Sequence, residues 1–344
     1  MANIKNDELD EWLDRVVRES VIGARGVEKI RRERFPHIGS YDCERVTVEL
    51  RGGEEIALFL KDFGTTQQSK DQPQLRRLRE LRVYEQLLDE TALGTPKLFG
   101  AMFDERREKC WMLLELVEGE VVDAIDLRGG VPAVEWLARL QRQFSERRTE
   151  LARCDFLLRH DAEYYEGKRA AARRDVLQIG PEHTARIDDI LACYRNCIAL
   201  FLAQPVSLVH GGYIPWHIFV DRATKPMRVC VVDWELAAHG ATLYDLAIFV
   251  DDAAPELRQK LCEAYRDAAQ RNGLPVPSSS ETAAVVDGFR LHRVIDWLSR
   301  SVEKAYAPEK MNWLIERAET LTAEVARREG SRIDAAQRSL NRPR

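Results

Sequence analysis

The feature that most constrains the fold is a change in hydrophobic period near Gly119. Before this glycine, several short runs have the alternating or β-branched pattern of strands; after it, most apolar residues recur every three or four positions, as in helices. Strands followed by helices favour an α+β fold in which the two are segregated. We therefore expect an N-terminal part over residues 1–118, a larger helical part over 119–330, and a frayed polar tail over 331–344.

The N-terminal third is expected to combine helices with two pairs of strands. In chain order, the patterns predict a helix over residues 7–32, a hairpin of strands 45–50 and 55–63, an amphipathic helix over 74–88, and a second strand pair over 97–103 and 109–117. The second strand of the hairpin carries Lys61, and the helix that follows it carries Glu80.

The rest of the chain is expected to be mostly helical, with one island of short strands. Helical periodicity covers residues 133–144, 161–175, 182–202, 254–270 and 307–328, and Ser278 with Glu281 forms the capping box of one further helix. The island consists of the apolar runs 206–209, 218–220 and 229–232.

The charge balance argues against some classes of partner. The chain has 52 basic and 57 acidic residues, a net charge of −5, so we expect no general attraction to nucleic acid or to an anionic membrane. The basic clusters 76–82 and 169–174 are most simply interpreted as solvated helix faces. No apolar run approaches the roughly 20 residues of a membrane span, and the N-terminus has no signal-peptide pattern, so a cytoplasmic protein is expected.

The residues that could take part in binding or catalysis occur in a characteristic order along the chain. A strand lysine, Lys61, is followed by a helix carboxylate, Glu80, and later by the segments Leu208-Val209-His210-Gly211 and Val231-Val232-Asp233-Trp234-Glu235. This order resembles the aminoglycoside phosphotransferase and choline kinase-like family of small-molecule kinases. Gly240 and Asp245-Leu246-Ala247 match the stretch that follows in that family.

The resemblance implies a bilobal, protein kinase-like fold with a small antiparallel-sheet lobe and a large, mainly helical lobe. It also implies roles for individual residues. Lys61, paired with Glu80, would hold nucleotide phosphates, and Asp233 would bind Mg²⁺. Glu85 is the other candidate partner for Lys61. The strand end from Glu115 to Val117 would offer backbone groups to an adenine.

The loop that begins at His210 departs from the family pattern. Gly212 stands where the family has its catalytic Asp, and His217 stands where it has a metal-binding Asn. Glycine has no side chain that could accept the proton of an acceptor hydroxyl. His210, also a candidate catalytic residue, is expected to hydrogen-bond loop backbone, and Asp245 is expected to cap a helix or to brace the loop. Trp216 and Tyr213 could either line a ligand site or pack in the core.

Three functions remain open on these residues. The first is binding of Mg·ATP or another nucleotide and of a small hydroxyl-bearing molecule, with phosphotransfer weak or lost because of Gly212. The second is an active phosphotransferase in which His217 or a substrate group replaces the missing base. The third is a non-catalytic ligand-binding or interaction protein. The acceptor and the oligomeric state are not specified by the sequence.

Overall fold

The computed structural model describes residues 7–21, 26–35, 41–66, 71–88, 92–107, 109–122 and 126–340. Its internal contacts divide the chain into two units. The N-terminal unit contains Met1–Val121 together with the later segment Phe219–Leu236, and the C-terminal unit contains Val122–Ile218 and Ala237–Arg344. We expected one boundary after residue 118; the second segment of the N-terminal unit was not anticipated.

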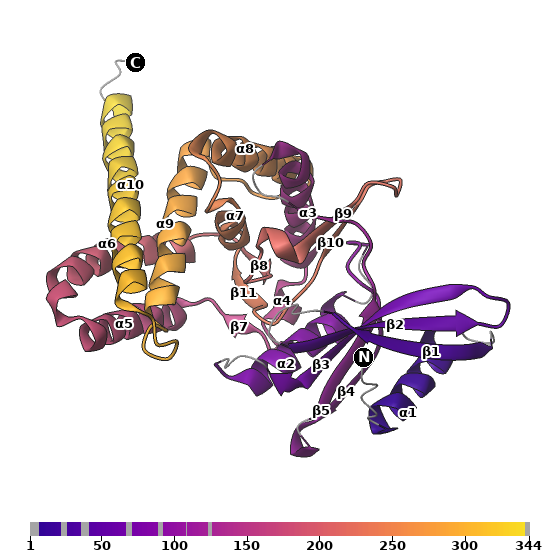
Figure 1. Cartoon of the computed structure of the whole chain (residues 1–344). Helices are drawn as coiled ribbons and strands as arrows, with labels where there is room; N and C mark the ends of the chain where they lie inside the picture. Colours follow the sequence, from indigo (N-terminus) through magenta and orange to yellow (C-terminus); the bar gives the residue numbers. More distant parts are fainter. Residues whose placement is uncertain are drawn as a thin grey trace. The chain divides into compact units, whose positions relative to one another are not determined.

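The N-terminal unit is built on a five-stranded antiparallel sheet (Figure 1). Its strand order is β1-β2-β3-β5-β4. The expected hairpin is present and longer than predicted, with a turn in which Gly52 and Gly53 have φ values of 111° and 84°. The strands are β1 (Val27–Arg34), β2 (Tyr41–Leu50), β3 (Glu55–Thr66), β4 (Leu98–Asp104) and β5 (Lys109–Glu115).

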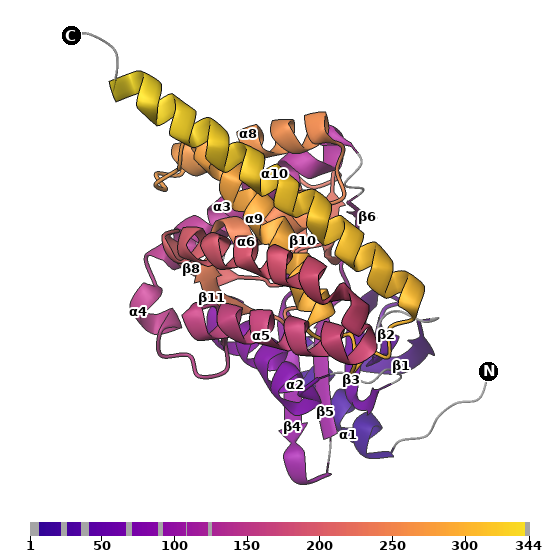
Figure 2. The same ribbon diagram turned by 90° about the vertical axis from the view of Figure 1, so that its left-hand side faces the viewer.

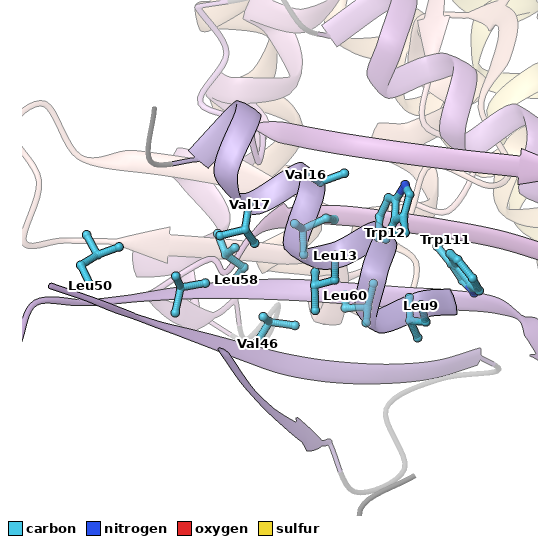
Figure 3. Packing of buried hydrophobic residues seen from close by; sticks show 12 residues of the cluster. Leu9, Trp12, Leu13, Val16, Val17, Val46, Leu50, Leu58, Leu60 and Trp111 are labelled. Atoms are coloured by element: carbon cyan, nitrogen blue, oxygen red, sulfur yellow. The ribbon is translucent and has the colours of Figure 1, made fainter. Parts of the chain in front are cut away.

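Helix α1 (Asp7–Val16), extended by a π-helical turn (Val17–Val21), covers one face of this sheet. Figure 3 shows its apolar side chains lying against those of the strands. Trp12 and Trp111 meet with their ring centroids 5.7 Å apart. The buried cluster consists of Leu9, Trp12, Leu13, Val16, Val17, Val46, Val48, Leu50, Leu58, Leu60, Trp111 and Leu113.

The expectation of one helix over residues 7–32 was wrong in its second half, because Val27–Arg34 form the edge strand β1. Tertiary contacts override the helical pattern there. Arg32 pairs with Glu44 of β2 at 2.6 Å and with Asp10 of α1 at 2.6 Å, and Arg31 pairs with Glu49 at 3.0 Å. These partners in β2 and α1 cannot be read from the spacing of residues 27–34.

The opposite face of the sheet carries the side chain of Lys61, because successive side chains of a strand alternate and Leu60 faces α1. Glu80, the expected partner of Lys61, lies on α2 (Pro73–Arg82), which continues as a π-helical segment to Leu88. The later segment of the unit adds a small sheet of order β10-β9-β6. Its strands are β6 (Glu120–Val121), β9 (Ile218–Asp221) and β10 (Arg228–Val231).

Gly119, at the start of this small sheet, occupies a position that excludes other residues. Its φ is 131°, and a Cβ atom there would lie 2.9 Å from the carbonyl oxygen of Val220. Both the backbone conformation and the close approach of a neighbouring strand therefore require glycine.

The C-terminal unit is mainly helical, with one three-stranded sheet of order β7-β11-β8. Its strands are β7 (Leu158–Arg159), β8 (Val206–Val209) and β11 (Ala238–Ala241). Its helices are α3 (Leu127–Ser145), α4 (Arg148–Leu151), α5 (Ala162–Ile179), α6 (Thr184–Leu202), α7 (Leu243–Val250), α8 (Pro255–Arg271), α9 (Ser279–Leu298) and α10 (Pro308–Leu340). Sequence patterns missed α4, α7, β6, β7 and β11.

The last two helices of the unit, α9 and α10, pack against one another (Figure 2). The capping box predicted at the start of α9 is present, with Ser278 and Glu281 each accepting from the other's backbone N–H. Helix α10 packs on α9 and α6 and continues to Leu340, into the segment expected to be a frayed tail; residues 341–344 lie outside the described part. None of the described helices combines the length and apolar character needed to cross a bilayer.

Candidate functional site

Lys61 and Glu80 form a buried ion pair in the N-terminal unit. Lys61 comes from the central strand β3 and Glu80 from α2, and the Lys61 Nζ lies 2.9 and 2.7 Å from the two carboxylate oxygens. The alternative partner, Glu85, pairs with Arg82 instead. The aromatic rings of Phe63 and Tyr41 flank the Lys61 Nζ at 4.9 and 5.3 Å. The lysine is therefore fixed in position by charge and by cation–π contacts.

Asp233 joins this pair directly after β10. Its Oδ1 lies 3.0 Å from the Lys61 Nζ, although the two residues are 172 positions apart. The backbone φ of Asp233 is 70°, a left-handed conformation that few residues other than glycine adopt. Trp234 anchors the segment because its side chain is fully buried and its Nε1 donates to the carbonyl of Val231 at 3.2 Å. The strained backbone and this anchor fix where the Asp233 carboxylate emerges.

A third carboxylate, Glu235, belongs to the same cluster. One oxygen each of Glu80, Asp233 and Glu235 lie within 4.8 Å of one another. Carboxylate oxygens are the ligands that Mg²⁺ prefers, so the donor set fits this ion. Sequence reasoning proposed Asp233 as the metal ligand and missed Glu235. The available signal was the Asp-Trp-Glu triplet, in which a core Trp lies between two carboxylates.

Two arginines of α2 tie that helix to the Asp233–Glu235 segment. Arg76 Nη1 donates to Glu235 Oε1 at 3.1 Å, and Arg79 Nη1 donates to the backbone carbonyl of Glu235 at 2.6 Å. Arg76 also pairs with the carboxylate of Asp71 and donates from Nε to the Asp71 carbonyl at 2.9 Å. The interpretation of residues 76–82 as a solvated face was wrong for Arg76, Arg77 and Arg79, which are all buried.

The protonation of the cluster follows from burial and from its mixed charges. Burial raises the pKa of Glu80 to about 7, against the opposing effect of Lys61. Burial would lower the pKa of Lys61, but the charges of Asp233 and Glu80 outweigh it and keep that pKa well above its ordinary value. Lys61 is therefore charged at neutral pH and can attract an anion such as a phosphate.

The strand end proposed to hold an adenine is only partly available. The backbone N–H of Glu115 donates to the carbonyl of Lys97 at 2.9 Å, so it cannot also donate to a base. The Glu115 carboxylate accepts from Arg228 at 2.5 and 2.8 Å; although burial opposes the change, these hydrogen bonds lower its pKa. Among the candidate residues here, Val117, beyond the end of β5, remains a source of backbone groups.

The loop after β8 lies in the C-terminal unit and is braced as expected. The buried Asp245 carboxylate accepts from the backbone N–H groups of His210 and Gly211 at 2.7 and 3.0 Å. Burial raises the pKa of Asp245 to about 7, although these two donors favour the charged form. The Gly212 N–H donates to His210 Nδ1 at 3.2 Å, so His210 holds loop backbone through that nitrogen.

His217, which the resemblance places at the position of the family's Asn, contacts Gly212. Its Nδ1 is 2.9 Å from the carbonyl oxygen of Gly212. Because a carbonyl only accepts, Nδ1 carries the proton in this contact, and Nε2 of the neutral ring is then an acceptor. Of the two loop aromatics, Tyr213 is buried and donates to the Ala133 carbonyl at 2.8 Å, whereas Trp216 is 70% exposed.

The comparisons with known proteins agree with this fold. Solved structures that match include the microcompartment-associated aminopropanol kinase (14% identity, TM-score 0.61, 94% of this chain and 98% of that one) and choline kinase from Cryptosporidium parvum Iowa II (14%, 0.58, 95% and 97%). The GDP complex of aminoglycoside 2′-phosphotransferase-IIIa also matches (12%, 0.55, 93% and 99%). A search of curated proteins found no match.

These similarities confirm the expected protein kinase-like fold, with its antiparallel sheet near the N-terminus and its helical C-terminal part. The model of the phosphotransferase enzyme family, APH, matches residues 42–277, which is more than half of the chain. This chain therefore belongs to the phosphotransferase enzyme family.

Proposed function

We propose that this protein binds Mg·ATP or a related nucleotide, together with a small hydroxyl-bearing molecule, and that phosphotransfer is weak or lost. The observation that carries the proposal is the Lys61–Glu80 pair with Asp233 at 3.0 Å from the lysine. A fixed ammonium beside carboxylates is the arrangement that binds nucleotide phosphates and their metal in kinases. Bound Mg²⁺ would neutralise phosphate charge, and Asp233 would hold it.

The chemistry of the structural neighbours supports a nucleotide and a small second ligand. The neighbours include kinases of aminopropanol and choline, and one is a GDP complex of an aminoglycoside phosphotransferase. Each of these acceptors is a small molecule, so we propose the same class here, with no nucleic acid and no membrane partner. We also propose that the protein works in the cytoplasm, where nucleotide is supplied.

The weak transfer step follows from Gly212. A glycine provides no group to accept the proton of an acceptor hydroxyl, and loss of a general base costs a factor of about 10² to 10⁴ in rate. Positioning and electrostatics supply most of the catalysis of phosphoryl transfer, so a small residual activity is compatible with this loss.

An active phosphotransferase is the second candidate, and the orientation of His217 favours it. With Nδ1 donating to the Gly212 carbonyl, Nε2 is the basic nitrogen of the neutral ring. His217 would then act as the base in place of the missing aspartate. A third possibility, a non-catalytic interaction protein, is disfavoured because such a protein would not need a buried lysine held between two carboxylates.

Calorimetric titration with Mg·ATP tests the nucleotide site without knowledge of the acceptor. We expect binding by the wild type and weaker binding by Asp233→Ala. Asp104→Ala is the matched control because Asp104 ends the edge strand β4 and its carboxylate contacts Arg107. Absence of binding by the wild type, with an unchanged melting temperature, would contradict the proposal and favour the third possibility.

The loop is tested by restoring the family residues. The double variant Gly212→Asp/His217→Asn is expected to raise ADP formation at least tenfold, because it restores a general base and a metal ligand. The single variant His217→Gln separates the first two candidates. Loss of all wild-type ADP formation in His217→Gln would support the active enzyme, and unchanged formation would exclude His217 as the base.

A further inference from the structure

Two basic side chains beside the proposed metal site each bridge two acidic groups. Lys61 contacts Glu80 and Asp233, and Arg76 contacts Asp71 and Glu235. In each case one of the two acidic partners belongs to the Asp233–Glu235 segment and the other to the N-terminal segment of the unit. The two carboxylates that this segment contributes to the candidate metal site, Asp233 and Glu235, are thus both engaged by basic side chains of the protein.

Each of the two basic residues has a second acidic partner, and this partner reduces the energetic cost of releasing Asp233 or Glu235. A buried cation that loses its only anion is strongly destabilising, because an uncompensated charge is left in a low dielectric. Arg76 would keep the Asp71 carboxylate and the Asp71 carbonyl, and Lys61 would keep both oxygens of Glu80. Asp233 and Glu235 can therefore turn towards a divalent cation without leaving a buried charge unpaired.

The backbone of the segment has an anchor that does not depend on these carboxylates. Arg79 donates to the main-chain carbonyl of Glu235 at 2.6 Å, and Trp234 is buried. A rotation of the Glu235 side chain from Arg76 to a cation would leave both of these contacts in place. The side chain can thus change partners while the segment keeps its position on α2.

We propose that Arg76 is a positioning residue that withholds the Glu235 carboxylate from divalent cations and releases it by pairing with Asp71 alone. This inference rests on the proposed function, since it concerns the regulation of the same metal site. A cation that arrives at Asp233 must compete with Arg76 for Glu235. Metal affinity is consequently set by α2 as well as by the carboxylates themselves.

The test measures free Mn²⁺ by electron paramagnetic resonance during titration of the full-length protein. Arg76→Gln is expected to lower the Kd for Mn²⁺ at least fivefold, because Glu235 loses its competing partner. In a Glu235→Gln background the same substitution should change the Kd less than twofold. This double-mutant cycle separates release of Glu235 from a general loss of positive charge, which would act in both backgrounds.

Arg82→Gln is the matched control, because Arg82 is an exposed arginine of the same helix that pairs with Glu85; it should leave the Kd unchanged. Asp71→Asn serves if Arg76→Gln does not fold. Because it removes the second partner of Arg76, Asp71→Asn alone should raise the Kd for Mn²⁺ at least twofold. In the Glu235→Gln background it should have no effect on this Kd.

Equal Kd values for wild type and Arg76→Gln, or a gain that persists with Glu235→Gln, would overturn the inference. Absence of measurable Mn²⁺ binding in both proteins would overturn it as well. If Mg·ATP still binds in calorimetry, only the role of Arg76 fails. If neither Mn²⁺ nor Mg·ATP binds to the wild type, the proposed function fails with it.

Discussion

Asp245 gives the sharpest prediction about stability, because its burial should make unfolding depend on pH. Its carboxylate is fully buried, and its pKa is raised from the ordinary value of 3.8 to about 7. A raised pKa means that the folded protein binds the proton more tightly than the unfolded chain. The contribution of this group is therefore fully present below pH 3.8 and is lost as the pH rises to about 7.

The size of the effect follows from the width of that window. Each pKa unit corresponds to about 1.4 kcal/mol, so between pH 5 and pH 8 the wild type should lose about 3 kcal/mol of unfolding free energy through Asp245. The variant Asp245→Asn cannot ionise and should lack this slope. It should also show a constant offset, since an amide oxygen replaces only one of the two acceptors of the His210 and Gly211 N–H groups.

Guanidinium unfolding of both proteins at several pH values measures this difference. Asp296→Asn is the control. Burial opposes the change, but Arg300 and Lys168 lower the pKa of Asp296 to about 2, so its contribution is lost only in acid, and its offset should stay constant from pH 5 to pH 8. The reasoning would be refuted if the difference between wild type and Asp245→Asn changed by less than about 1 kcal/mol over this range.

The remaining predictions concern the other fixed contacts and use the same unfolding assay. Lys61→Met should destabilise the protein by about 3–5 kcal/mol, because it leaves Glu80 buried without its cation, and adding Glu80→Leu should recover most of the loss; a double variant no more stable than the single one would contradict this. Gly119→Ala should lower the free energy of unfolding by about 2 kcal/mol or more, because of the positive φ at residue 119 and the nearby Val220 carbonyl; a variant as stable as the wild type would contradict that geometry. Ser278→Ala should cost about 1 kcal/mol by removing the capping box, and an unchanged free energy of unfolding would contradict this role of Ser278.

Most of the fold was predictable from hydrophobic period, and the failures have physical causes. The strands of the hairpin and the amphipathic helices were predicted because each has one buried face. Helix α7 was missed because every residue from Leu243 to Val250 is buried, so its sequence has no amphipathic period. Strand β11 was missed because Ala238–Ala241 contains none of the strand-forming residues Val, Ile, Thr, Phe, Tyr and Trp.

The site was predictable where its residues are recognised by order along the chain. Lys61, Glu80 and Asp233 were proposed from that order, and the structure brings them together. Arg76 was not proposed, because an Arg-rich helix has the pattern of a solvated surface, and Glu235 was noted only as part of the segment that contains Asp233. Their contact joins residues 159 positions apart, which no local pattern can indicate.

The division of the N-terminal unit into two segments has a consequence for how the protein is made. Lys61 leaves the ribosome 172 residues before Asp233. At a synthesis rate of about 5–20 residues per second, Asp233 is therefore synthesised about 10–30 s after Lys61. Of the two carboxylate partners that Lys61 has in the folded protein, only Glu80 has been synthesised by then, and the Phe219–Leu236 segment that completes the unit is still missing. The nucleotide site can therefore form only after Val122–Ile218, the first segment of the helical unit, has been synthesised.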